Sequence, residues 1–240
     1  MPVKKLVYRE EIEKIKKFLE SKGSERNVEG MQRFGISFKK AYGVNIPIIR
    51  KLAREYKRNH ELAFELWETK IHELMLLAIF IDDYKQVTES QMEKWVRDFA
   101  SWDICDQCCS NLFEKTPYVY DKIYEWSKAK EEFIKRSAFT LIAVVAVHNK
   151  KIEDIELFEY FKLIEREAGD GRKFVRKAVN WALRQLGKRS KILFDEAVET
   201  ANRILLQDSK SAKWIAKDAL REFRMKEDIY WKKRIGQNVK

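Results

Sequence analysis

Residues that break regular secondary structure are scarce in this chain, and this scarcity limits what the chain can fold into. The 240 residues include 8 Gly and 3 Pro, about 5% of the chain against roughly 12% in average usage. An all-β fold of many short strands needs frequent turns, and turns rely on these residues. The sequence therefore predicts an all-α fold.

The chain is apolar enough to form a substantial core. Hydrophobic residues make up 45% of it, including 14 Phe, 9 Tyr and 7 Trp, which excludes a disordered tail. No stretch rich in Pro, Gly or Ser separates two such cores. We therefore expect residues 1–240 to form a single domain.

Four segments read as variations on one amphipathic helix. Phe133 and Phe174 are 41 positions apart, and Phe174 and Trp214 are 40 apart. Antiparallel helix pairs in HEAT-like arrays repeat about every 40–47 residues. The four segments are 71–80, 133–142, 174–183 and 212–223.

Other amphipathic stretches lie between these segments and supply the partner helix of each pair. They are residues 9–20, 58–68, 89–99, 153–168 and 193–206. Stacked pairs form an α-solenoid with a concave face, where an extended partner binds. An irregular helical bundle is the alternative, and both are all-α.

The expected location is the cytoplasm, or the nucleoid of a prokaryote. The longest apolar run, residues 138–147, is half as long as the roughly 20 residues that a membrane span needs. Charged residues at the amino terminus interrupt any signal sequence before an apolar core can form. We expect no membrane partner, and a capped solenoid can act as a monomer.

All three cysteines fall within five residues, at Cys105, Cys108 and Cys109. A structural zinc site needs four ligands, and the three histidines stand far away in the sequence. We expect buried thiols on one helix, with neither a metal nor a cofactor.

The net charge of +11 is concentrated in residues 171–191, which contain eight basic residues and no acidic one. On a helix, one face carries the apolar residues and the opposite face carries cations. Trp181 lies on the cationic side. A basic stripe with an exposed aromatic suits a polyanion, whereas the plainer alternative is a solvated face. The cations of this face are Lys173, Lys177, Arg184 and Lys188.

Arg136 is a further basic residue that is expected to point away from the core, because it lies about 180° from Ile134, Ala138 and Leu141 on its helix. If 133–142 and 174–183 are successive inner helices, Arg136 and the basic stripe share the concave surface. Together they would bind the phosphates of one nucleic-acid backbone.

The segment 99–113 places a carboxylate next to an indole. Ser101 is a candidate N-cap for a helix that begins at Trp102. Trp102 and Asp106 are then at positions i and i+4 on one face, and the cysteines turn to the other side. Asp103 lies at the flank, where it serves the first turn of the helix or an Arg partner. The alternative is an indole in the core and a carboxylate in a salt bridge.

Five motifs occur in the order and approximate spacing of AlkD-type DNA glycosylases, which the chain resembles over about residues 30–225. These are HEAT-like repeat proteins that excise alkylated purines without enclosing the damaged base in a pocket. The motifs are MQRF at 31–34, YGVNIPIIR at 42–50, SWDICD at 101–106, IKRSA at 134–138 and NWALR at 180–184.

The resemblance implies roles for individual residues. Asp106 corresponds to the catalytic carboxylate, and Trp102 and Trp181 correspond to the indoles that contact the sugar of the damaged nucleotide. Arg136 and Arg184 correspond to phosphate ligands. The sequence departs from the family pattern at two of these positions: Phe34 stands where relatives have a Tyr near the DNA, and Ser101 replaces a Trp.

The function expected from residues and resemblance is that of a monofunctional, metal-free alkylpurine DNA glycosylase acting on duplex DNA with alkylated bases. A second hypothesis is a non-catalytic HEAT-like module that binds DNA or structured RNA through backbone phosphates. The third is a protein-interaction scaffold.

Overall fold

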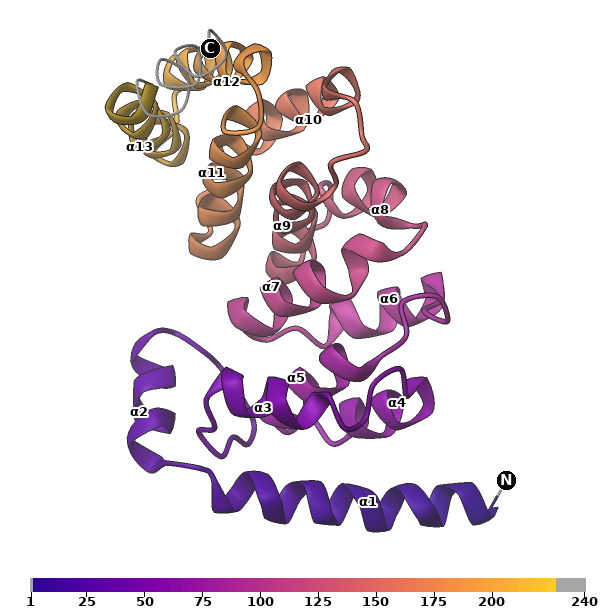
Figure 1. The fold of residues 1–240 in the computed structure, drawn as a ribbon. Coiled ribbons are helices and arrows are strands. Elements are labelled where there is room, and N and C mark those ends of the chain that lie inside the picture. Colours follow the sequence, from indigo (N-terminus) through magenta and orange to yellow (C-terminus); the bar gives the residue numbers. More distant parts are fainter. Residues whose placement is uncertain (1, 228–240) are drawn as a thin grey trace, which may run out of the picture. The chain divides into compact units, whose positions relative to one another are not determined.

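A computed structural model describes residues 2–227 of the chain, with side chains described for residues 8–225. Every regular element in that range is a helix, apart from one isolated parallel bridge between Lys40 and Ile71. The all-α prediction is therefore confirmed. The chain divides into two compact units, residues 1–118 and 119–240 (Figure 1). That residues 1–240 form one continuous domain stays a prediction.

Unit 1 consists of seven α-helices and one short 3-10 helix within the described residues. They are α1 (Pro2–Ser21), α2 (Glu25–Arg33), α3 (Ile46–Ala53), α4 (His60–Glu68), α5 (His72–Ile81), α6 (Glu89–Arg97), α7 (Trp102–Asn111) and η1 (Phe113–Lys115).

Unit 2 continues with six further helices in the described part of the chain. They are α8 (Val119–Trp126), α9 (Glu132–His148), α10 (Asp154–Glu167), α11 (Lys173–Gly187), α12 (Lys191–Leu205) and α13 (Lys210–Glu227).

The core of unit 1 is built around α5, which packs against α3, α4 and α7. Leu74, Leu77 and Ile81 are fully buried there. Trp67 of α4 and Trp95 of α6 stack with their ring centroids 4.0 Å apart. These apolar contacts fix the position of α7, which carries Trp102 and Asp106.

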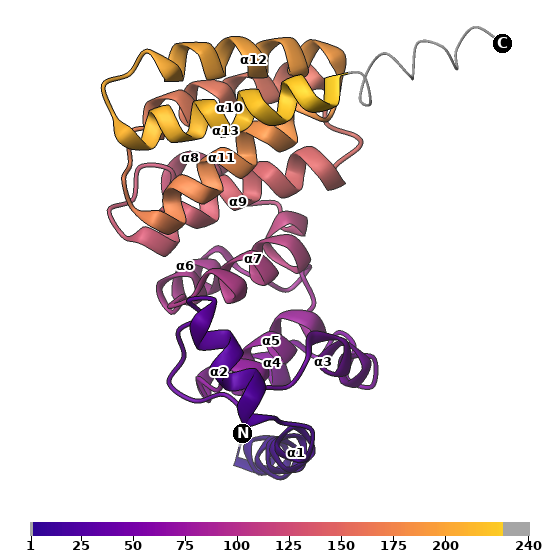
Figure 2. The ribbon, with the colours of Figure 1, turned by 90° about the vertical axis from the view of Figure 1, so that its left-hand side faces the viewer.

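The core of unit 2 lies between α9 and α11, and α12 runs alongside both α10 and α13 (Figure 2). Gly187 ends α11 at a close approach, because a Cβ atom there would lie 2.9 Å from Ala197 Cβ and 3.0 Å from the Phe223 ring. A larger residue would force α11 away from α12 and α13.

The four repeated segments of the sequence correspond to α5, α9, α11 and α13. Of these, α11 packs directly against both α9 and α13. The partner stretches correspond to α1, α4, α6, α10 and α12. The sequence did not predict α2, α3 and α8. Within the described range, no helix combines the length and the apolar character that a membrane crossing requires.

Candidate nucleic-acid interface

The helix α7 begins where the sequence predicted and divides its side chains as expected. Ser101 is the N-cap residue, with extended backbone angles (φ −145°, ψ 154°), although its side chain makes no capping hydrogen bond. Trp102 and Asp106 are partly exposed, and the three cysteines are completely buried. The indole and the carboxylate therefore lie one turn apart at the surface of unit 1.

The Trp102 indole contacts a second aromatic residue from a distant part of the chain. Its Nε1 donates a hydrogen bond to the Phe34 carbonyl oxygen at 3.2 Å. Phe34 follows α2, precedes Gly35 with its φ of +74°, and has a side chain that is 76% exposed. Only the family resemblance had connected Phe34 with the site. An exposed ring of this size is a surface on which a base or sugar can pack.

A cleft of about 380 Å³ adjoins Phe34 and is lined by basic Arg26 and Arg33, by the buried His72 and by the partly buried Asp103. His72 Nε2 lies 2.8 Å from Asp103 Oδ2, and Ser101 Oγ donates to Asp103 Oδ1. Asp103 lies in the first turn of α7, as one of the two expectations for it stated, and its side-chain partner is a buried histidine from α5 rather than an arginine.

These contacts set the protonation of Asp103. Burial acts to raise the pKa of its carboxyl, but the hydrogen bonds from His72 and Ser101 outweigh burial and lower the pKa below its ordinary value. Asp103 is therefore an ionised structural group that ties α7 to α5.

We expect Asp103→Asn to change how stability depends on pH. A carboxyl with a lowered pKa in the folded state contributes stability above its ordinary pKa of about 3.9, and this contribution is lost as pH falls through the lowered value. The gap in urea midpoint between wild type and variant should be present at about pH 6 and shrink below about pH 4. A gap that stays constant on acidification would contradict the ionised assignment.

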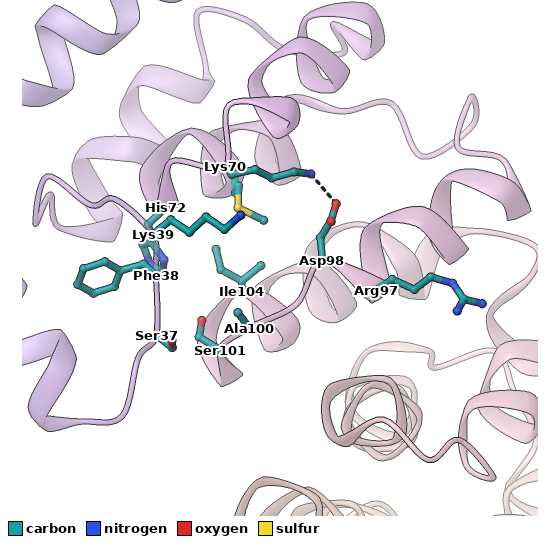
Figure 3. A pocket seen from close by; sticks show the side chains of 11 residues that line it. Ser37, Phe38, Lys39, Lys70, His72, Arg97, Asp98, Ala100, Ser101 and Ile104 are labelled. Carbon is teal, nitrogen blue, oxygen red and sulfur yellow. Dashed lines mark hydrogen bonds and ion pairs between the residues drawn. The ribbon is translucent and has the colours of Figure 1, made fainter.

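On another side of His72, a cavity of about 240 Å³ is lined by Lys39, Lys70, Arg97 and Asp98 and by apolar groups such as Ile104 (Figure 3). Asp98 Oδ2 lies 2.6 Å from Lys70 Nζ and accepts from Trp67 Nε1 at 2.8 Å. Its carboxylate therefore serves the packing of α4 onto α6.

The basic stripe of α11 is only partly free in the folded chain. Lys173 and Lys177 are exposed, and Trp181 is partly exposed. Arg184 Nη1 forms an ion pair with Glu222 of α13, and Lys188 Nζ lies 2.6 Å from the same carboxylate. The stripe therefore has an acidic neighbour in space, which comes from α13 and not from residues 171–191.

Glu222 is held in its ionised form. Burial acts to raise the pKa of its carboxyl, and the hydrogen bonds from Lys188 and Arg184 more than offset burial and lower the pKa. The sequence did contain a signal for this contact, because Glu222 follows Arg184 by 38 positions, close to the repeat length.

We expect Glu222→Gln to strengthen DNA binding. Removing the carboxylate leaves Arg184 and Lys188 unneutralised. The slope of log affinity against log salt for duplex binding should therefore steepen by the equivalent of up to about two phosphate contacts. Fluorescence anisotropy with a short duplex at several salt concentrations measures this. An unchanged salt dependence would show that neither cation meets DNA.

Arg136 also differs from its predicted position. It is 5% exposed, and its Nη1 donates to the Phe174 carbonyl oxygen at 2.7 Å. The helix α9 is packed on more than one side, so the face opposite its apolar stripe is buried as well. Arg136 therefore connects α9 to the first turn of α11.

The three cysteines behave as apolar core residues. Burial raises the pKa of the Cys108 and Cys109 thiols, which keeps both neutral. In the part of the chain that the structure describes, no three His, Cys, Asp or Glu side chains are grouped so that they could hold a metal ion.

Comparison with known proteins gives a family and several structural relatives. The family described as DNA alkylation repair enzyme matches residues 15–223. A solved structure described as belonging to "a new family of proteins related to the HEAT-like repeat DNA glycosylases with affinity for branched DNA structures" matches with a TM-score of 0.72 and 18% identity, covering 88% of this chain and 94% of that one.

A designed armadillo repeat protein in complex with the peptide (KR)4 matches with a TM-score of 0.37 and 14% identity, over 73% of this chain and 91% of that one. No curated protein matches the sequence. The match with the TM-score of 0.72, at 18% identity, establishes the HEAT-like repeat fold.

Proposed function

Because the chain belongs to the DNA alkylation repair enzyme family, we propose that it is a DNA glycosylase that hydrolyses the N-glycosidic bond of cationic N3- or N7-alkylated purines in duplex DNA. The observation that carries the proposal is the partial exposure of Trp102 and Asp106 one turn apart on α7. By contrast Trp67, Trp95 and Trp126 are buried.

Release of a cationic base requires few catalytic groups from the protein. Alkylation at N3 or N7 puts positive charge on the purine, which makes the base a good leaving group without an acid from the protein. The departing base leaves an oxocarbenium-like sugar, which the Asp106 carboxylate stabilises while it orients the attacking water. The electron-rich face of Trp102 favours the positive charge that develops on the sugar.

Residues of unit 2 add affinity in this proposal. The exposed Lys173 and Lys177 bind phosphates, and Trp181 offers an aromatic surface to DNA. Both lysines are solvated, so neither is suited to form a Schiff base with the sugar, and the enzyme is monofunctional. It acts as a cytoplasmic monomer without a metal or other cofactor.

The test is base release from duplex DNA treated with a methylating agent. We expect 7-methylguanine or 3-methyladenine to appear in the supernatant, identified by mass spectrometry, at a rate well above spontaneous depurination. Release at the spontaneous rate, by a protein that binds the same duplex, would reject the glycosylase and leave a binding protein.

That binding protein is the second candidate, and the Glu222 ion pairs favour it. Two predicted phosphate ligands are already neutralised there, and Arg136 is buried. Such a surface suits a module that binds DNA through fewer phosphate contacts or recognises the shape of the DNA. The structural relative is described as having affinity for branched DNA structures. Binding to a four-way junction much tighter than to a duplex, without base release, would identify this function.

A further inference from the structure

Unit 1 contains a strongly basic cleft whose lining does not include Trp102 or Asp106. Its volume is about 400 Å³, and it lies where the carboxyl ends of α3, α5 and α7 meet. Five basic residues line it, against a single carboxylate from Asp82. The basic residues are Arg50, Arg54, Lys57, Arg58 and Lys115.

The one carboxylate does not neutralise these cations. The Asp82 side chain is fully buried, with its Oδ1 2.6 Å from His60 Nδ1 and its Oδ2 accepting from Gln91 Nε2 at 2.7 Å. Among residues 8–225, the ion pairs of the structure include none of the five cations, and Asp83 attracts Arg58 without forming an ion pair with it. The cleft therefore keeps its positive charge.

Arg50 is held in a defined orientation by neutral groups. Its guanidinium carbon lies 4.2 Å from the centroid of the Phe80 ring, and its Nη2 donates to Gln107 Oε1 at 3.0 Å and to Asn111 Oδ1 at 3.1 Å. Neutral acceptors and an aromatic ring orient the side chain without cancelling its charge. A fixed guanidinium with its full charge is well suited to binding a phosphate.

Helix dipoles explain only part of this arrangement. Cations at the carboxyl end of a helix are stabilising, and Lys115 Nζ donates to the Asn111 carbonyl oxygen at 2.7 Å. That effect amounts to a few tenths of a kcal/mol up to about 1 kcal/mol per exposed charge. Five like charges around one cleft repel each other, so a polyanion binding there gains affinity by relieving this repulsion.

We propose that this cleft binds the sugar-phosphate backbone of DNA, at a place separate from Trp102 and Asp106. The proposal rests on the proposed function only in taking DNA as the ligand. The ten residues of α7 span about 15 Å, with Trp102 at one end and Asn111 at the cleft. This length corresponds to about four nucleotides of one strand, so the cleft would hold the backbone to one side of the lesion.

The test removes two cations with exposed side chains, Arg54 and Lys57. In the double variant Arg54→Ala, Lys57→Ala we expect the slope of log affinity against log salt, for a short unmodified duplex, to fall by about 1.8, which is 0.9 for each phosphate contact. The matched control is Lys17→Ala on α1 with Lys22→Ala in the turn that follows it, which removes the same charge from exposed positions outside the cleft. The control should change the slope by less than half as much.

Equal slopes for the two double variants would overturn the proposal. So would loss of duplex binding when sodium phosphate replaces sodium chloride at equal ionic strength, because this would identify a site for small anions. Base release is measured on the same proteins. A wild type that releases no base but shows the expected slope change in the cleft variant disproves the glycosylase and supports the cleft.

Discussion

Replacing Asp106 by Asn is expected to reduce the rate of 7-methylguanine release by about 100- to 1,000-fold, the usual cost of removing one electrostatic contact to a transition state. The amide has nearly the same shape as the carboxylate but carries no charge, so it cannot stabilise an oxocarbenium-like sugar. Single-turnover base release from methylated duplex measures the change.

Affinity for the duplex should change by no more than about twofold in this variant, because Asp106 acts on charge that develops only in the transition state. Asp121→Asn, an exposed aspartate in the first turn of α8, is the matched control and should release base at the wild-type rate. Turnover by Asp106→Asn equal to wild type would remove Asp106 from the mechanism. A parallel loss of affinity and turnover, with thermal unfolding unchanged, would make it a binding residue.

The division of α7 into two faces was predictable because it depends on one helix alone. Once a helix begins at Trp102, the 3.6-residue period fixes Trp102 and Asp106 on one face and Cys105 and Cys109 on another. The structure confirms this division. The N-cap position of Ser101 was equally local, since serine favours the extended backbone that precedes a helix.

Residues on α9 and α11 were harder to place because each of these helices has several neighbours. Periodicity put Arg136 opposite the apolar stripe, but the opposite side of a helix inside a stack is covered too. The acid that pairs with Arg184 lies on α13, outside any window of sequence that a helical pattern covers. A charge pattern on one helix therefore did not reveal which cations are free.

The unpredicted helices are short and carry weak signals. α2 has nine residues and none of them is buried, so it has no apolar stripe to detect. α3 has eight residues and contains Pro47, which is compatible with the first turn of a helix but reads as a break. Both helices belong to the region that presents Phe34, which explains why the contact between Phe34 and Trp102 was not predicted from periodicity.

Glu73→Ala is expected to lower the free energy of unfolding of unit 1 by about 3–5 kcal/mol, the largest stability effect we expect from one substitution in this chain. Glu73 lies in the first turn of α5 and is completely buried. Its Oε1 accepts from the backbone N–H of Gly43 at 2.7 Å and of Val44 at 3.2 Å, and its Oε2 accepts from that of Tyr42 at 3.0 Å. Alanine would leave these donors without their acceptor.

The loop that Glu73 holds cannot easily find another arrangement. Gly43 has a φ of +76°, and a Cβ atom there would lie 2.3 Å from the Ser24 carbonyl oxygen, so the backbone must pass close to the start of α2. Urea unfolding followed by circular dichroism measures the loss, and Glu29→Ala, an exposed glutamate of α2, should stay within about 0.5 kcal/mol of wild type. Because residues 42–44 lie between α2 and α3, Glu73→Ala should also loosen the attachment of Phe34 near Trp102. Faster amide exchange at Tyr42 and Gly43 would show this directly, whereas a loss below about 1 kcal/mol would mean that solvent already satisfies these donors.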